Sequence, residues 1–106
     1  MFLLVETSGR KMENIREISE YINKLNSTDE IFEFFKEILT DSEIETLSKR
    51  WRILTMLNDG RTQRNIAQEL GVSLCKVTRG SKIIKNQNAI VTKLIKENTD
   101  EHEYAK

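Results

Sequence analysis

The stretch RTQRNIAQELGVSLCKVTRGSKIIK, residues 61–85, carries six Lys or Arg and a single Glu, which gives it a net charge of about +5. The whole chain of 106 residues has 17 basic and 17 acidic residues, so the remainder carries about −5. Basic side chains gathered in this way bind the phosphates of nucleic acids. Each of them can also be an ordinary solvated residue, and for Lys85 both interpretations stand.

The spacing of small and apolar residues in this stretch predicts a helix-turn-helix over about residues 63–82. Ala67 stands where two steeply crossing helices need a small side chain. Gly71 supplies the left-handed backbone position of the turn at low steric cost, and Ser73 can cap the second helix. The small core of the motif is expected from Ile66, Leu70, Val72 and Val77. The first residues of the second helix would then face base edges in the major groove. The alternative is an ordinary helical hairpin with a basic surface.

The rest of the chain favours an all-α fold. Proline is absent, there are four glycines, and apolar residues recur every three or four positions. Thr40 with Glu43 fits a capping box. Helices are predicted at about 13–25, from Ser27 or Thr28 to Ile38, from Thr40 to Gly60, from Thr62 to Leu70, from Leu74 to Lys85, and from Ile90 to Asn98.

For two of these helices the sequence predicts which sides are buried. Phe32 lies off the apolar stripe of the second helix, so that helix is expected to be covered by more than one neighbour. The third helix is expected to bury one stripe, with Trp51 as a core residue. That stripe consists of Ile44, Leu47, Trp51, Leu54 and Leu57.

Composition bounds the domain organisation and the class of protein. One helical domain is expected over 12–98, with a flexible arm over 1–11 and a frayed tail over 99–106. Cys75 is the only cysteine and His102 the only histidine, so neither a zinc site nor a catalytic Cys/His or Ser/His/Asp set is available. The apolar run MFLLV is far too short to span a membrane. We therefore expect a cytoplasmic protein that is not an enzyme and holds no metal or cofactor.

Gly80 is unusual because it stands inside the second helix of the motif. A glycine there costs about 0.5–1 kcal/mol relative to alanine, and it indicates that something approaches the backbone closely. Either another helix or a flat ligand satisfies this pattern. The neighbouring Arg79 can pair with a phosphate or a carboxylate, since its guanidinium fork suits both.

The segments LTDSE, LSKRWRIL, TQRNIAQELG and VTRGS, within residues 39–85, resemble the Trp repressor family. The resemblance implies an intertwined, six-helix homodimer. It also implies sequence-specific repression at a double-stranded DNA operator of tryptophan metabolism or transport genes, with L-tryptophan as the corepressor. Base contacts bridged by water are a known property of operator binding in this family.

The resemblance also assigns roles to individual residues. Arg79 and Arg50 would hold the two faces of the indole, and Gly80 would let the ring approach the helix. A partner subunit would contribute a wall and a carbonyl that receives the ammonium. The ligand residues implied are Leu39, Thr40, Arg50, Arg79, Gly80 and Ile83. The residues expected at DNA are Gln63, Arg64, Leu74, Cys75, Lys76 and Thr78, and the charge pattern adds Lys82.

Some positions depart from the family pattern. Ile83 stands where better-known members have a serine, and Glu37 stands where they have an apolar residue. The alternative function is therefore a DNA-binding regulator that is ligand-independent or senses another small molecule. A helical module that binds an acidic protein is a further alternative. Arg50 as a surface ion-pair partner and Thr40 as a simple helix cap are the corresponding structural interpretations.

Overall fold

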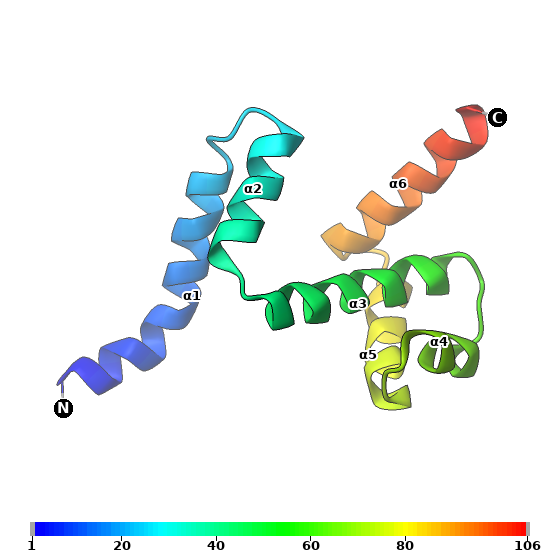
Figure 1. Cartoon of the computed structure of the whole chain (residues 1–106), viewed down its shortest axis with the longest axis horizontal. Coiled ribbons are helices and arrows are strands. Elements are labelled where there is room, and N and C mark those ends of the chain that lie inside the picture. The colour runs from blue at the N-terminus through cyan, green and yellow to red at the C-terminus, as the bar shows by residue number, and fades with distance from the viewer. Residues whose placement is uncertain (1, 106) are drawn as a thin grey trace. The chain divides into compact units, whose positions relative to one another are not determined.

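A computed structural model describes the backbone of residues 2–105 and the side chains of residues 10–98. This part of the chain consists of six α-helices joined by short connections, as Figure 1 shows. The all-α class and the number of helices are thus confirmed. The chain divides into two compact units, residues 1–40 and residues 41–106.

The first unit consists of α1 (Phe2–Ile22) and α2 (Thr28–Ile38). Helix α1 ends three residues before the predicted Leu25, because the chain tightens there: the backbone N–H of Lys24 donates to the carbonyl of Tyr21 at 3.0 Å. Such three-residue hydrogen bonds are a common way to close the last turn of a helix. Ser27 caps α2, since its Oγ accepts from the backbone N–H of Glu30 at 3.2 Å.

Most residues of the two predicted terminal segments, 1–9 and 99–106, have side chains outside the described range. The flexible arm was predicted for residues 1–11, and the frayed tail for residues 99–106. Helix α1 begins at Phe2 rather than near residue 13, and α6 (Ile90–Ala105) ends at Ala105 rather than at Asn98, so both helices are longer than predicted. The flexibility of the arm and the fraying of the tail stay predictions.

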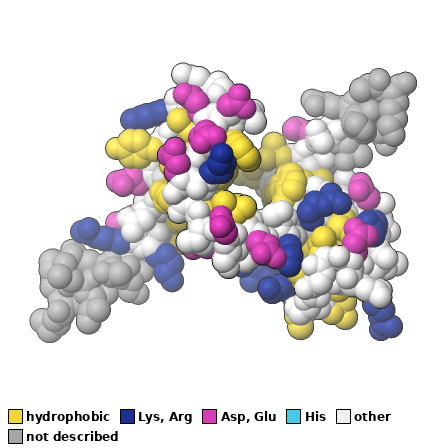
Figure 2. All heavy atoms as spheres, in the orientation of Figure 1, with side chains coloured by type: hydrophobic (Ala, Val, Ile, Leu, Met, Phe, Trp, Pro, Cys, Tyr) yellow, Lys and Arg dark blue, Asp and Glu magenta, His cyan; other side chains and the backbone are white. Residues whose placement is uncertain are grey.

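Apolar side chains of the first unit are open to solvent. Phe32 is 59% exposed and Ile38 51% exposed, and none of the side chains described between residues 10 and 40 is buried. Figure 2 shows these apolar side chains interspersed with acidic ones. Within a single chain, the prediction that α2 is covered by more than one neighbour is therefore wrong.

The second unit consists of α3 (Asp41–Asn58), α4 (Gln63–Leu70), α5 (Leu74–Lys85) and α6 (Ile90–Ala105). Helix α3 packs against the other three, and α4 and α5 also pack against each other. Figure 1 shows α5 crossing α3 steeply, with α4 beside it. Long helix α3 is therefore the platform on which the α4–α5 pair is held.

The core of this unit lies between α3 and the α4–α5 pair. Met56, Ile66 and Val77 are completely buried, and Ile53 joins them. Full burial of a side chain of this size stabilises a fold by about 1.5–3 kcal/mol. The partly buried residues around this core are Leu57, Ala67, Leu70 and Val72.

The buried side of α3 differs from the predicted stripe. Leu54 is buried as predicted, but Leu47 and Trp51 are each 47% exposed, while Ile53 and Met56 are buried instead. Helix α3 carries apolar residues on more than one side, so periodicity alone does not decide which side meets α4 and α5. Trp51 is thus not a core residue of this chain.

Candidate functional site

Each backbone feature predicted for the helix-turn-helix is present. The Oγ1 of Thr62 accepts from the backbone N–H of Asn65 and caps α4. Gly71 has φ 67° and ψ 38°, the left-handed conformation that ends the helix. Ser73 then caps α5 by accepting from the backbone N–H of Lys76 at 3.3 Å. These local hydrogen bonds fix where each helix starts, and so fix which side chains α5 presents.

The outer face of α5 is open to solvent. Leu74 is 47% exposed, and four further residues predicted to approach DNA are exposed as well: Cys75, Lys76, Thr78 and Lys82. On α4, Arg64 is exposed and Gln63 is half-buried. The hydroxyl of Thr78 donates to the Oε1 of Gln63 at 2.9 Å and joins the two helices at this face.

The only acidic residue of the stretch 61–85 is neutralised by a local partner. Glu69 accepts hydrogen bonds from the Arg61 guanidinium. This hydrogen bond lowers the pKa of Glu69 and raises the pKa of Arg61. None of the ion pairs in the described part of the chain involves the other basic residues of α4 and α5. The exposed face therefore keeps its positive charge for an external anion.

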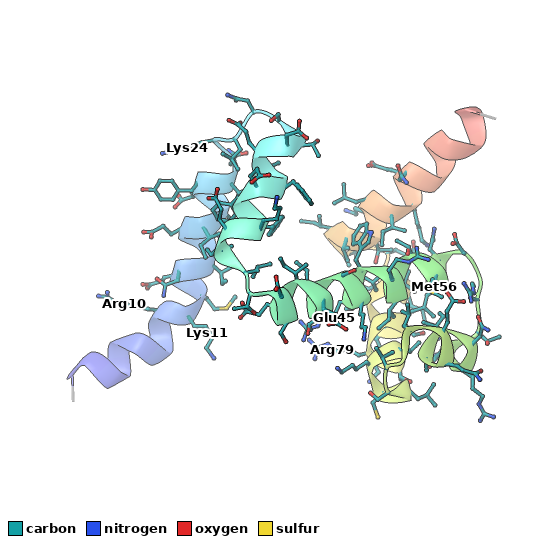
Figure 3. All side chains as sticks on the ribbon, in the orientation of Figure 1. Arg10, Lys11, Lys24, Glu45, Met56 and Arg79 are labelled. Carbon is teal, nitrogen blue, oxygen red and sulfur yellow. The ribbon has the colours of Figure 1, made fainter. Side chains whose placement is uncertain are left out.

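A cavity of about 290 Å³ lies between α3 and α5, on the inner side of the exposed face. Two arginines from different helices line it, Arg50 of α3 and Arg79 of α5. Figure 3 shows the Arg79 side chain extending from α5 on the side away from α4, whereas Met56 lies in the core under α3. The other lining residues are Ile53, Leu54, Lys76, Gly80 and Ile83. The cavity thus combines an apolar floor with a cationic rim.

Gly80 is buried because α3 approaches it closely. A Cβ added at Gly80 would lie 2.6 Å from the Cγ2 of Ile53, closer than carbon atoms can pack. Of the two interpretations of this glycine, close approach of another helix is what the structure contains. Gly80 also lines the cavity, so the same position sets the distance between the helices and one wall of the hollow.

The family model described as Trp repressor protein matches residues 13–99. The chain belongs to the Trp repressor protein family. A Trp operon repressor homolog of Xylella fastidiosa is 42% identical over 66 residues, which cover 61% of this chain and 72% of that protein. A Trp operon repressor homolog of Chlamydia caviae is 37% identical over 67 residues, covering 62% and 66% respectively.

A third relative carries no functional name. It is the uncharacterized protein YerC of Bacillus subtilis, 28% identical over 76 residues, which cover 69% of this chain and 73% of that protein. None of the solved structures matches the chain significantly. The Trp repressor family comprises DNA-binding regulators of transcription rather than enzymes, which agrees with the helix-turn-helix and the basic face described above.

The structure brings together four of the six residues that the Trp repressor resemblance places at a ligand: Arg50, Arg79, Gly80 and Ile83 line one cavity. Leu39 and Thr40 belong to the first unit. Leu39 is the C-cap of α2, where its backbone N–H donates to the carbonyl of Phe35 at 3.1 Å. The role of these two residues at a ligand stays a prediction, as does the structural interpretation of Thr40 as a helix cap.

Lys76 was assigned only to DNA by the sequence, but it lines the cavity as well. It also lines a second hollow of about 360 Å³, which the sequence did not predict. This hollow lies between the start of α3 and the turn before α5, and Ser42, Lys49 and Ser73 are among its lining residues. Its basic lining residue Lys76 is far from Lys49 and Arg50 in the sequence and meets them only because α5 crosses α3, so no spacing in the sequence indicates this hollow.

Among the described residues, no cluster of His, Cys, Asp and Glu side chains could hold a metal ion. No helix within the described range is both long and apolar enough to cross a membrane.

Proposed function

We propose that this protein is a sequence-specific transcriptional repressor that binds its DNA operator as a homodimer when L-tryptophan occupies the cavity behind α5. The operator would belong to genes of tryptophan metabolism or transport. The single observation that carries the proposal is the cavity itself, in which two arginines from different helices face one hollow directly behind the exposed face of the helix-turn-helix.

Contact with DNA is supported by the chemistry of the exposed face. Helix α5 begins at a capped N-terminus, and its first turns present Leu74, Cys75 and Thr78 to solvent. In a helix-turn-helix this part of the second helix enters the major groove. Arg64 and Lys82 flank it and are exposed, so they can neutralise phosphates on either side.

Tryptophan as the ligand is supported by the composition of the cavity wall. A guanidinium plane stacks well on an aromatic ring, and Arg50 and Arg79 offer two such planes. An arginine can also form two charge-assisted hydrogen bonds to a carboxylate. Ile53 and Leu54 supply an apolar floor for an indole. A volume of about 290 Å³ lies at the lower end of the range of small-molecule pockets.

Homodimerisation is supported by the apolar side chains that one chain leaves uncovered. In the first unit Ile15, Tyr21 and Phe32 are more than half exposed, and in the second unit Trp51 is 47% exposed. Apolar surface that one chain leaves open to solvent can be covered in an interface with a second molecule. A second copy of the chain would cover it and would set two α5 helices about 34 Å apart, one turn of DNA.

The proposed mechanism couples the tryptophan cavity to the DNA-binding face through the orientation of α5. An indole between α3 and α5 would hold α5 at one angle to α3, so that both recognition helices of the dimer fit successive major grooves. The coupling free energy is reciprocal, and about 1–3 kcal/mol, a factor of roughly 5 to 150 in affinity, is typical. DNA would therefore tighten tryptophan binding by the same factor by which tryptophan tightens DNA binding.

Isothermal titration calorimetry of tryptophan into the full-length protein tests the proposal. We expect a saturable heat for the wild type that is lost in Arg79→Ala. Lys85→Ala is the matched control, because Lys85 is an exposed basic residue of α5 that does not line the cavity, and it should keep the tryptophan heat. An absent heat in the wild type, or an unchanged heat in Arg79→Ala, rejects tryptophan as the corepressor.

A second candidate function is favoured by Ile83 and Lys76. Both line the cavity, where one adds an apolar side chain and the other a third cation. Such a wall also suits another aromatic or aliphatic carboxylate. A thermal-shift comparison of tryptophan, the other amino acids and indole distinguishes the two functions. If another compound raises Tm and tryptophan does not, the protein is a regulator of the same family with a different effector.

A further inference from the structure

A hydrogen bond between side chains fixes how two residues of the exposed face present their remaining donors and acceptors. Thr78 is in the second turn of α5 and Gln63 is the first residue of α4. The Thr78 hydroxyl donates to the Gln63 Oε1 at 2.9 Å. Among the residues that the structure describes, this is the only hydrogen bond between side chains of α4 and α5.

The donor and acceptor inventory of this pair is simple. A threonine hydroxyl has one proton, and here that proton is given to glutamine, so the Oγ1 of Thr78 is left as an acceptor. The carboxamide oxygen of Gln63 accepts the hydrogen bond from this proton. The Nε2 of Gln63, with its two N–H donors, is therefore left for another partner. The pair therefore presents one acceptor and one donor group, from two helices, to whatever lies against the face.

Among the four bases, one matches this pattern on its major-groove edge. Adenine offers the N6 amino group as a donor and N7 as an acceptor, whereas guanine offers two acceptors. Cytosine offers a donor alone, and thymine an acceptor beside a methyl group. Guanine offers no donor to the Thr78 Oγ1 as long as that hydroxyl gives its proton to Gln63.

We propose that Gln63 and Thr78 act as one unit that selects adenine by direct contact, in contrast to the water-bridged contacts known for the family, with the Oγ1 of Thr78 accepting from N6 and the Nε2 of Gln63 donating to N7. This inference rests on the proposed function, because it requires α5 to lie in the major groove. The neighbouring Leu74 and Cys75, both exposed on the same helix, are largely apolar and do not compete with the unit for hydrogen bonds to a base.

Selection of binding sites from a pool of random duplexes, with tryptophan present, tests the inference on the full-length protein. Wild type should enrich adenine at one position of each half-site. Thr78→Val keeps the shape of the side chain and removes the hydroxyl, and Gln63→Glu keeps the acceptor for Thr78 and removes both N–H donors. Each should lower the preference for adenine at that position by roughly 5- to 150-fold, the usual range for a bidentate contact.

Thr78→Ser is the matched control, because it retains the hydroxyl and should retain the preference for adenine. Thermal unfolding of the Thr78 variants should stay close to that of wild type, since Thr78 is exposed. The inference is overturned if Thr78→Val keeps the wild-type preference, or if it weakens binding to all duplexes equally, as loss of a phosphate contact would. If wild type itself enriches no sequence, the proposed function fails together with the inference.

Discussion

Replacing Gly80 with alanine should loosen the contact between α3 and α5 on which the motif depends. The added Cβ would lie 2.6 Å from the Cγ2 of Ile53 and 3.5 Å from the Cδ1 of Leu57. Adding a methyl group to a packed core costs about 1–3 kcal/mol. Alanine recovers about 0.5–1 kcal/mol of helix propensity. We therefore expect Gly80→Ala to lower the free energy of unfolding by up to about 2.5 kcal/mol.

Urea unfolding followed by far-ultraviolet circular dichroism measures this loss, and a second substitution identifies its cause. Ile53→Leu removes the Cγ2 methyl group that the new Cβ would meet, and alone it should cost less than about 1.5 kcal/mol. The double variant should lose less unfolding free energy than the sum of the losses in the two single variants, because the methyl group that the new Cβ would meet is absent. Coupled changes of this kind between contacting residues are typically about 0.5–3 kcal/mol.

Gly71→Ala is the matched control for this experiment. It also loses stability, but through its positive φ of 67° rather than through contact, since a Cβ there would meet nothing within 4 Å. Ile53→Leu should not rescue it. If Gly80→Ala proves more stable than wild type by the full helix-propensity gain, the close approach of α3 to α5 does not exist and the argument for Gly80 fails.

Three further predictions concern charge and hydrogen bonding. Because Arg61 lowers the pKa of Glu69, this pair stabilises the fold above the ordinary carboxyl pKa, and the contribution disappears as pH falls through the lowered value. Glu69→Gln should therefore reduce the dependence of Tm on pH in the acid range, and an unchanged dependence would contradict the pairing. Lys82→Ala should lower the slope of log affinity for random duplex against log salt by about 0.9, whereas alanine at a lysine of α1 should not change it. Thr92→Val removes a buried hydroxyl that donates to the carbonyl of Ile83 at 2.8 Å, so it should cost about 0.5–1.5 kcal/mol. Differential scanning calorimetry should then show Tm falling by about 4–8 °C per kcal/mol, and a Tm equal to wild type would contradict that contact.

The features that could be predicted from the sequence are those decided by neighbours along the chain. Thr62, Gly71 and Ser73 act on backbone groups within three or four residues of themselves, so their residue types sufficed to locate the ends of α4 and α5. The core of the motif could be predicted for the same reason, since the position of the turn decides where Ile66 and Val77 pack.

The features that escaped prediction depend on which surfaces meet across the fold. Trp51 and Met56 are both apolar residues of α3, and nothing in their spacing states which one faces α4 and α5. The place of Lys76 at the cavity could not be predicted either, because it depends on the angle between α3 and α5. For Gly80 the sequence indicated a close approach but not the approaching group, which packing alone determines.

The lack of buried side chains in the first unit bears on how the protein responds to dilution. No side chain described between residues 10 and 40 is fully buried within one chain, and isolated helices of the length of α2 are marginal in water. We therefore expect part of the free energy that keeps α1 and α2 folded to come from contact with another molecule. If that molecule is a second copy, each tenfold dilution removes about 1.4 kcal/mol of it. The number of copies in a cell would then decide how much of the N-terminal third is folded.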